Sequence, residues 1–293
     1  MRVAVVGPLC RDTIIIAGQQ TNHLGGVTYY AGRALASLGA DVTVIATFGV
    51  EPKNFTAPLG NIRLIHIPAA GTLHFVNTYS SAEADARQQH AVIPINTLTP
   101  ADLTQVDLHT FDAIILGPLF HGNLPTETLT YIAKAQRPTY LAGQGLFRYL
   151  DGERIVWRHP ENLTDAIPYV TAIQVDDAEL RFLTGQDDVT RGVRALQKAG
   201  AHDVLVTSAN RGSFIFSGRR RFDIPAFPPK KLADSTGAGD SYLAGYVFTR
   251  TNGAGYEPAG RFAAATASLA IETAVAFQGT VTDVEARQRS ANL

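Results

Sequence analysis

The chain alternates short apolar runs with longer segments in which apolar residues recur every three or four positions. Val3–Val6 is a β-branched run of the kind that forms a buried strand. From Val27 to Leu38 the apolar residues follow helical spacing, and Gly39 stands where a helix would end, so this segment predicts an amphipathic helix. Val42–Ala46 then predicts a second strand, which gives the order strand, helix, strand.

The same order returns along most of the chain. Further strands are predicted at Thr13–Ile16, Ala113–Leu116, Thr139–Leu141, Ala172–Val175 and Val204–Thr207. Further helices are predicted at Thr126–Ala135, Asp177–Leu183, Val189–Ala199, Ala238–Thr249 and Arg261–Ala276. Strands that alternate with helices build a mostly parallel sheet covered on both faces, so we predict an α/β fold, a three-layer α/β/α sandwich.

Two segments break this order and predict a small β lid. Residues 12–24 and 72–95 contain strand-like runs with no helix between them. No linker, low-complexity tract or internal repeat is visible, so we expect residues 1–293 to form a single domain that carries the lid. An exposed edge of the lid could pair with a second copy of the chain, which would make a homodimer.

Composition narrows the classes of partner. The 293 residues are 45% hydrophobic and 17% charged, which provides a large core and excludes extensive disorder. The formal net charge is −1, so no general positive field would hold a nucleic acid. The most apolar later stretch, residues 262–277, is interrupted by polar residues and predicts a buried helix rather than a membrane span. Cys10 is the one cysteine, which excludes an intrachain disulfide and favours a cytoplasmic location.

Several well-known site motifs are missing from the sequence. No Gly-Lys pair occurs, which excludes a Walker A loop, and the first strand is not followed by the glycine pattern of a dinucleotide site. The motifs HExxH and GxSxG do not occur either. Any catalytic chemistry must therefore come from another arrangement.

The strongest chemical signal is the string Asp-Ser-Thr-Gly-Ala-Gly-Asp at residues 234–240, which leads into an apolar helical run. Gly237, Ala238 and Gly239 would lie at a helix N-terminus, where unpaired N–H groups and the helix dipole attract an anion such as phosphate. Asp240 is placed to accept a proton from an attacking hydroxyl group, and phosphoryl transfer needs this combination. The alternative is that the glycines serve tight packing and Asp240 favours the first helical turn.

This string resembles the C-terminal signature of the ribokinase-like (PfkB) carbohydrate kinases, and the resemblance extends over nearly the whole chain. Asp12 follows the first strand, where that family has a substrate-binding acid. Gly25 and Gly26 match the family's Gly-Gly before its first long helix. The resemblance implies that Asp240 is the catalytic base and that Gly237–Gly239 form the anion hole.

The resemblance also implies a binding site for ATP. The segment Thr207–Gly212, which includes Arg211, lies where the family places its nucleotide-binding loop, and residues 262–276 lie where it holds adenine. Thr236 would contact the phosphates together with the two glycines of the anion hole. Asp234 and Thr236 also match a loop that binds a monovalent cation such as K⁺ in some members.

The chain departs from the family pattern at three places. The family commonly has Asn-x-x-Glu to organise Mg²⁺, whereas this chain has Asp176 and Glu179, which would hold the ion through water. The same pair is also an ordinary capping box at a helix start, and the two roles can coexist. Ala209 replaces a usual glycine in the nucleotide loop, and residues 51–64 are short where many members carry a second signature.

The predicted substrate-binding residues are Asp12, Gly25, Gly26, Asn77, Gln144 and Arg148. Asp12 could accept two hydrogen bonds from a vicinal diol, although it could equally cap a turn. Gln144 and Arg148 follow a predicted strand, and ligands of α/β sheets gather at the carboxyl ends of strands. The alternative for Arg148 is a surface salt bridge. Asn77 lies on a lid strand, one face of which would meet the cleft, and Arg87 is a weaker lid candidate.

The run Gln-Gly-Leu-Phe-Arg at residues 144–148, with the short lid, is similar to the inositol-kinase-like branch of the family. It implies ATP-dependent phosphorylation of a hydroxyl group on a sugar or polyol such as myo-inositol. Two alternatives stay open. A nucleoside kinase of the same family would hold its base between aromatic rings, which Tyr29, Tyr30, Phe75 and Tyr79 could supply. A non-catalytic ligand-binding protein could also use this scaffold.

Overall fold

The computed structural model describes residues 1–293 except residues 17, 80–87, 93–95 and 291–293. Its centre is a nine-stranded sheet, named sheet A. In spatial order sheet A contains β15 (Arg220–Ile224), β14 (Ser213–Ser217), β13 (Asp203–Thr207), β12 (Ala172–Asp176), β9 (Thr139–Ala142), β8 (Ala113–Leu116), β1 (Arg2–Pro8), β4 (Asp41–Phe48) and β5 (Arg63–Pro68). β14 pairs antiparallel with β13 and β15, and the other neighbours pair parallel. The sheet is therefore mostly parallel, as predicted.

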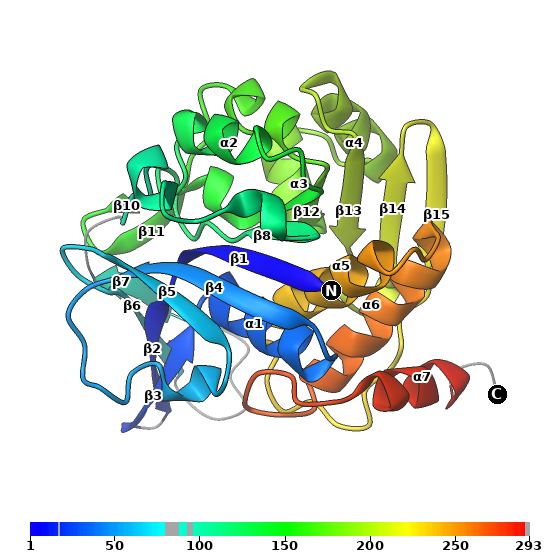
Figure 1. The fold of residues 1–293 in the computed structure, drawn as a ribbon. Helices are drawn as coiled ribbons and strands as arrows, with labels where there is room; N and C mark the ends of the chain where they lie inside the picture. The colour runs from blue at the N-terminus through cyan, green and yellow to red at the C-terminus, as the bar shows by residue number, and fades with distance from the viewer. Residues whose placement is uncertain (17, 80–87, 93–95, 291–293) are drawn as a thin grey trace.

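Helices cover both faces of sheet A (Figure 1). One layer contains α1 (Val27–Ser37), α5 (Ala238–Thr251), α6 (Tyr256–Ala270) and α7 (Val281–Ser290). The other contains α2 (Thr126–Ala133), α3 (Asp177–Thr184) and α4 (Val189–Lys198). In the central strand β1, Val3 and Val5 pack toward the first layer, whereas Ala4 and Val6 pack toward the second. Because successive strand side chains point to opposite faces, an all-apolar strand is what a two-sided core requires. The three-layer α/β/α sandwich is confirmed.

A second sheet, sheet B, forms the lid and has six strands. In spatial order these are β10 (Arg148–Asp151), β11 (Arg154–Trp157), β7 (Gln88–Val92), β6 (Leu73–Tyr79), β2 (Cys10–Ile16) and β3 (Gln19–Gly25). The predicted lid segments 12–24 and 72–95 supply four of these strands, and residues 17, 80–87 and 93–95 of that prediction lie outside the described residues. The hairpin β10–β11 was not predicted; it extends the lid and begins at Arg148. The polar strand β3 is one edge of sheet B, and pairing there into a homodimer stays a prediction.

The helix predicted at Arg261–Ala276 has different limits in the structure. α6 begins earlier, at Tyr256, and ends at Ala270. The carbonyl oxygen of Ile271 accepts the backbone N–H groups of Ala233 and Asp234, so it is engaged by the loop before α5. The end of α6 therefore anchors the loop that carries the Asp-Ser-Thr-Gly-Ala-Gly-Asp string.

Within the described residues, no helix has both the length and the apolar character that crossing a bilayer requires.

Candidate active site

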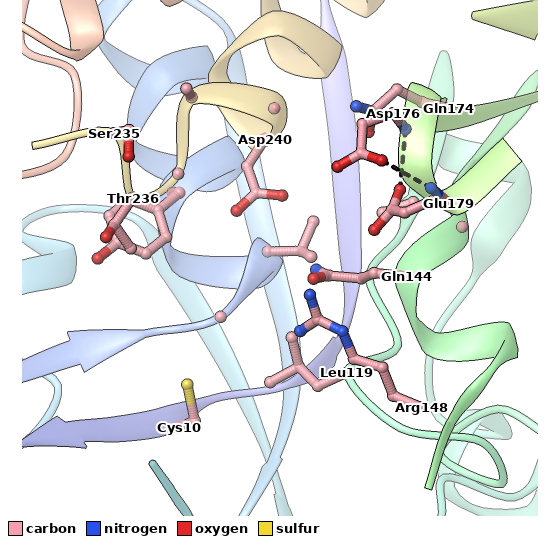
Figure 2. Close-up of a pocket in the computed structure, with 18 of the residues that line it drawn as sticks. Cys10, Leu119, Gln144, Arg148, Gln174, Asp176, Glu179, Ser235, Thr236 and Asp240 are labelled. Carbon is pink, nitrogen blue, oxygen red and sulfur yellow. Dashed lines mark hydrogen bonds between the residues drawn. The ribbon is translucent and has the colours of Figure 1, made fainter. Parts of the chain in front are cut away.

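A cavity of about 360 Å³ lies between sheet B and the N-terminus of α5. β2 and β6 of the lid contribute Asp12 and Asn77, and the end of β12 contributes Asp176. Figure 2 shows Asp240 pointing into the middle of this cavity, with Arg148 and Gln144 below it. The structure thus brings together side chains from most of the chain length, as expected for an α/β sheet that binds at the carboxyl ends of its strands.

The predicted anion hole at Gly237–Gly239, called the anion cradle from here on, lies where the Asp-Ser-Thr-Gly-Ala-Gly-Asp string leads into α5. Gly237 is the N-cap residue, with a φ of 75° that favours glycine. A Cβ at Gly237 would lie 2.4 Å from the ring of Tyr30, so the close packing of α1 against this turn also requires glycine. Gly237, Ala238 and Gly239 all line the cavity. Their backbone N–H groups belong to a first helical turn, which has no intrahelical acceptors, and this turn can bind an anion.

Asp240 lies in the first turn of α5 and faces the cavity. Burial raises the pKa of its carboxyl group to about 6, the charge of Arg148 opposes this rise, and the charge of Asp12 adds to it. A carboxylate whose pKa lies near neutrality is suited to take up a proton from a hydroxyl group. The chemistry expected of Asp240 is therefore available at this position.

Asp176 and Glu179 line the same cavity at the start of α3. They form the capping box that the sequence allowed: Asp176 Oδ1 accepts the Glu179 N–H at 2.8 Å, and Glu179 Oε2 accepts the Asp176 N–H at 2.9 Å. Burial, and next the charge of Asp176, raise the pKa of Glu179 to about 7. Asp176 and Glu179 therefore cap α3 and line the cavity at the same time.

The pair also fits the predicted Mg²⁺. Within the described residues no cluster of three or more histidine, cysteine or acidic side chains could cage a metal ion. Mg²⁺ needs no such cage, because it is usually held by one or two carboxylates with waters and substrate phosphates. Each carboxylate of the pair gives one oxygen to the capping box and keeps a second oxygen for the ion or its waters.

The part of the cavity where the sequence predicts substrate binding is polar. Asp12, Gly26, Asn77, Gln144 and Arg148 all line it, as the sequence predicted. Gly25 is not among the lining residues, but a Cβ there would lie 2.1 Å from Asp12 Oδ2. Gly25 therefore leaves the space that the carboxylate of Asp12 occupies.

A second cavity, of about 670 Å³, adjoins the cradle on the side of α6. Its walls are mostly apolar and include Phe227, Pro228, Leu232, Ala267 and Ile271. The two cavities are contiguous, because they share five lining residues: Asp176, Thr207, Ser235, Ala238 and Gly239. An apolar slot that opens beside an anion cradle can hold a flat ring attached to phosphates.

The predicted nucleotide loop is only partly turned toward this second cavity. Thr207, Ala209 and Gly212 line it, and Ala209 adopts a φ of 47° that glycine would adopt at lower cost. Arg211 does not line it; its guanidinium is paired with Asp177 at 2.6 Å and is 67% exposed. Contact of Arg211 with the nucleotide stays a prediction.

The residues of the predicted monovalent-cation loop have local partners. The carboxylate of Asp234 accepts the backbone N–H of Thr236 at 2.8 Å, and Thr236 lines the first cavity. This bond holds the loop before the cradle in a tight turn. A requirement for K⁺ stays a prediction.

Sequence reasoning missed two lining residues of interest, Gln174 and Tyr30. Gln174 was included in a predicted buried strand, where a polar residue between apolar neighbours was the available signal. Tyr30 was considered only as one of four aromatic residues that could hold a nucleobase, because its packing on Gly237 joins segments distant in sequence. Arg87 lies outside the described residues.

The fold and the site together define a phosphotransferase for small hydroxylated molecules. The sequence model of the pfkB family of carbohydrate kinases matches residues 62–279, which is more than half of the chain. The chain therefore belongs to this family. It is thus a carbohydrate or nucleoside kinase of the ribokinase family.

Individual relatives differ in their named substrates. A cytidine kinase of Thermococcus kodakarensis is 24% identical over 261 residues, which are 84% of this chain and 87% of that protein. An inositol 3-kinase of Oryza sativa subsp. japonica is 26% identical over 252 residues, which are 83% of this chain but only 61% of that protein. Both relatives are therefore consistent with the family, and they do not agree on the acceptor.

A solved structure of similar fold is a pyrophosphate-dependent kinase in the ribokinase family, complexed with a pyrophosphate analog and myo-inositol. It superposes with a TM-score of 0.85 at 21% identity and covers 97% of this chain and 99% of that chain. This likeness establishes the shared fold.

Proposed function

We propose that this protein transfers the terminal phosphoryl group of ATP to a hydroxyl group of a ring polyol, with myo-inositol as the leading candidate. The observation that carries the proposal is the position of Asp240. Its carboxylate stands beside the N-terminal turn of α5 and in the same cavity as Asp12 and Arg148. A base, an anion cradle and an acceptor pocket therefore meet at one point.

In the proposed reaction, Asp240 accepts the proton of the attacking hydroxyl group. The hydroxyl oxygen forms a bond to the terminal phosphorus of ATP, the bond between that phosphorus and the bridging oxygen breaks, and ADP leaves. The N–H groups of Gly237–Gly239 donate to the oxygens of the moving group and stabilise its charge. Mg²⁺ beside Asp176 and Glu179 would neutralise phosphate charge when it is bound.

The walls of the second cavity favour ATP over pyrophosphate as the donor. Among the described lining residues of both cavities, Arg148 is the sole cationic side chain. Pyrophosphate has no apolar part and would need basic side chains around its dense charge. A purine ring, in contrast, would fill the slot formed by Phe227, Ala267 and Ile271. The apolar slot therefore supports a nucleotide donor.

The acceptor pocket favours a polyol over a nucleoside. Carboxylate, amide and guanidinium groups of Asp12, Asn77, Gln144 and Arg148 line it, and such groups match a ring with many hydroxyls. One face of Phe75 is stacked on Phe120, with ring centroids 5.6 Å apart, and Tyr30 packs on Gly237. Each of these two rings is thus already packed on one side within the protein, which leaves less aromatic surface for a nucleobase.

The test is a donor and acceptor screen with the purified protein and Mg²⁺. ATP or pyrophosphate would be combined with myo-inositol, hexoses, pentoses or cytidine, and phosphorylated product would be measured directly. The proposal expects transfer from ATP to myo-inositol. Transfer to cytidine alone would support the nucleoside alternative, and transfer from pyrophosphate alone would contradict the donor assignment. Nucleotide binding without transfer to any acceptor would support a non-catalytic protein.

A variant in the second cavity tests the binding of ATP separately from the binding of the acceptor. Ala267→Phe would place a ring in the slot, which ATP must share. We expect the KM for ATP to rise at least ~10-fold, since most of the apolar contact of the base would be lost, while the KM for the acceptor changes little. An unchanged KM for ATP would place the nucleobase elsewhere.

A further inference from the structure

We propose that the side-chain amide of Gln174 donates a hydrogen bond to the phosphoryl group that is being transferred, so that it acts as a side-chain member of the anion cradle. This inference rests on the proposed kinase function, which assigns no role to Gln174. It concerns one position on β12, two residues before Asp176 of the capping box.

The register of β12 places Gln174 on the side of the sheet that faces α5. Its neighbours Ile173 and Val175 pack into the core on the side of α3, and Ala172 packs into the core on the side of α5. Alternation along the strand therefore directs the Gln174 side chain toward the first turn of α5. Gln174 is the polar residue at a position where the two-sided core would accept an apolar one.

The side-chain amide of Gln174 lies beside Gly239 of the anion cradle. A Cβ at Gly239 would lie 3.2 Å from Gln174 Nε2, so the amide nitrogen lies against the cradle backbone. Gln174 lines the same cavity as Asp240, and Figure 2 shows it on the side of Asp176 and Glu179. The amide nitrogen therefore lies where a phosphoryl group held by the cradle would meet it.

The side-chain amide of Gln174 lacks a hydrogen-bond partner among the described residues. The residue is 8% exposed, and its side chain makes no hydrogen bond with any described residue. Because Gln174 lines the cavity, its amide is open to a ligand there. A bound phosphoryl group supplies the missing acceptor, and it does so only when the donor substrate is in place.

An amide suits this position for an electrostatic reason. Asp176, Glu179 and Asp240 already place negative charge around the cradle, and the incoming phosphates add more. The amide N–H groups donate to phosphoryl oxygens and keep this ability at every pH at which the protein is folded. A carboxylate at this position would repel the same group.

The test compares Gln174→Met, which keeps the length of the side chain but removes its donor, with Gln174→Glu, which replaces the donor by a charge. With ATP and the acceptor found in the screen, we expect Gln174→Met to lower kcat at least ~10-fold and Gln174→Glu to lower it further. The KM for the acceptor should stay within about threefold of wild type, since the proposed bond is made to the phosphoryl group and not to the acceptor. A kcat within twofold of wild type in Gln174→Met overturns the proposal.

Two controls separate this role from packing. Gln197→Met removes an amide on α4 that bonds to the Gly218 carbonyl and lines neither cavity, so its kcat should equal that of wild type. The melting temperature of Gln174→Met should be at least that of wild type, because a methionine replaces a buried amide without a protein partner. A lower melting temperature together with a normal kcat in the folded fraction would assign Gln174 a packing role instead.

A measurement of nucleotide binding tests the role of Gln174 without any acceptor present. Calorimetry with Mg²⁺ would compare adenylyl imidodiphosphate, which has a γ-phosphoryl group, with ADP, which ends at its β-phosphate. In wild type the ratio of the two affinities includes the Gln174 contact, and we expect the ratio to fall roughly tenfold in Gln174→Met. An unchanged ratio overturns the inference. If wild type phosphorylates nothing but this ratio still falls, the proposed function fails while the phosphate contact of Gln174 stands.

Discussion

The guanidinium of Arg148 and the carboxyl group of Asp240 share one cavity, and the charge of Arg148 limits the rise that burial causes in the pKa of Asp240. Arg148 begins the hairpin β10–β11 of the lid, whereas Asp240 belongs to α5 on the main domain. The lid therefore influences the protonation of the proposed base as well as the shape of the acceptor pocket.

This relationship predicts a shifted pH profile for Arg148→Met. In wild type, kcat should fall as pH drops through about 6, because Asp240 becomes protonated and cannot accept a proton. Without the guanidinium, the pKa of Asp240 rises, and the pKa of Glu179 rises with it, so the acidic limb moves to higher pH. The measurement is kcat against pH at saturating acceptor.

Arg154→Met on the neighbouring strand β11 is the matched control, because this exposed residue lines neither cavity. Its profile should overlay that of wild type. An unshifted acidic limb in Arg148→Met would mean that another group titrates in the reaction.

Gly25→Ala should weaken acceptor binding selectively. The backbone at Gly25 needs no left-handed conformation, so the effect comes from the new Cβ, which would lie 2.1 Å from Asp12 Oδ2 and displace that carboxylate. We expect the KM for the polyol to rise at least ~10-fold with little change in the KM for ATP, because a lost charged hydrogen bond is worth about 1.5–3 kcal/mol. Steady-state kinetics with each substrate varied in turn would show this, and an equal rise in both constants would contradict it.

Gly237→Ala and Gly253→Ala form a matched pair at positive φ. Gly253 has a φ of 88° and open space around it, so alanine there should cost about 1 kcal/mol of backbone strain and leave turnover intact. At Gly237 the same strain is joined by a clash with the ring of Tyr30. Urea unfolding should show a larger loss of stability for Gly237→Ala, and turnover should fall at least ~10-fold as the cradle moves. Equal losses in both variants would argue against close packing at the cradle.

Asp176→Asn should raise the Mg²⁺ concentration needed for half-maximal activity, because it removes one negative charge from the proposed metal site. It should also lower the pKa of Glu179, since the charge of Asp176 contributes to raising it. Asparagine is as good an N-cap as aspartate, so stability should change little.

Asp188→Asn at the start of α4 is the control for the capping effect alone, because Asp188 Oδ1 accepts the Arg191 N–H at 2.8 Å in an equivalent cap. Both variants should melt at similar temperatures, and only Asp176→Asn should change the Mg²⁺ titration. If the Mg²⁺ titration shifts in both variants, or in neither, Asp176 does not bind the metal ion.

The parts of the fold that follow from local patterns were predicted correctly. β1, α1 and β4 could be placed from apolar spacing and Gly39, and the cradle from seven consecutive residues. These features depend on contacts within a short stretch of chain. The capping box at Asp176 and Glu179 was predicted for the same reason.

Features that depend on distant partners were missed. Arg148 was expected only to follow a predicted strand, and the strand that it begins was not predicted, because the hairpin β10–β11 gains its place in sheet B by pairing with β7. α6 ends at Ala270 because the loop at Ala233 takes the carbonyl of Ile271, a contact that spacing along the helix does not reveal. The strands β5, β14 and β15 and the helix α7 were missed as well.

The most direct test of the central claim is phosphoryl transfer by Asp240→Asn. Nucleotide binding should be retained, and turnover with ATP and the best acceptor should fall at least ~100-fold, because the base that takes the hydroxyl proton is gone. Above pH 6 the wild-type carboxylate is charged at a cost to stability, so the variant should be at least as stable as wild type at pH 8. We expect Asp240→Asn to be a stable, ATP-binding protein without turnover; turnover within a few-fold of wild type would contradict the role of Asp240 as the base.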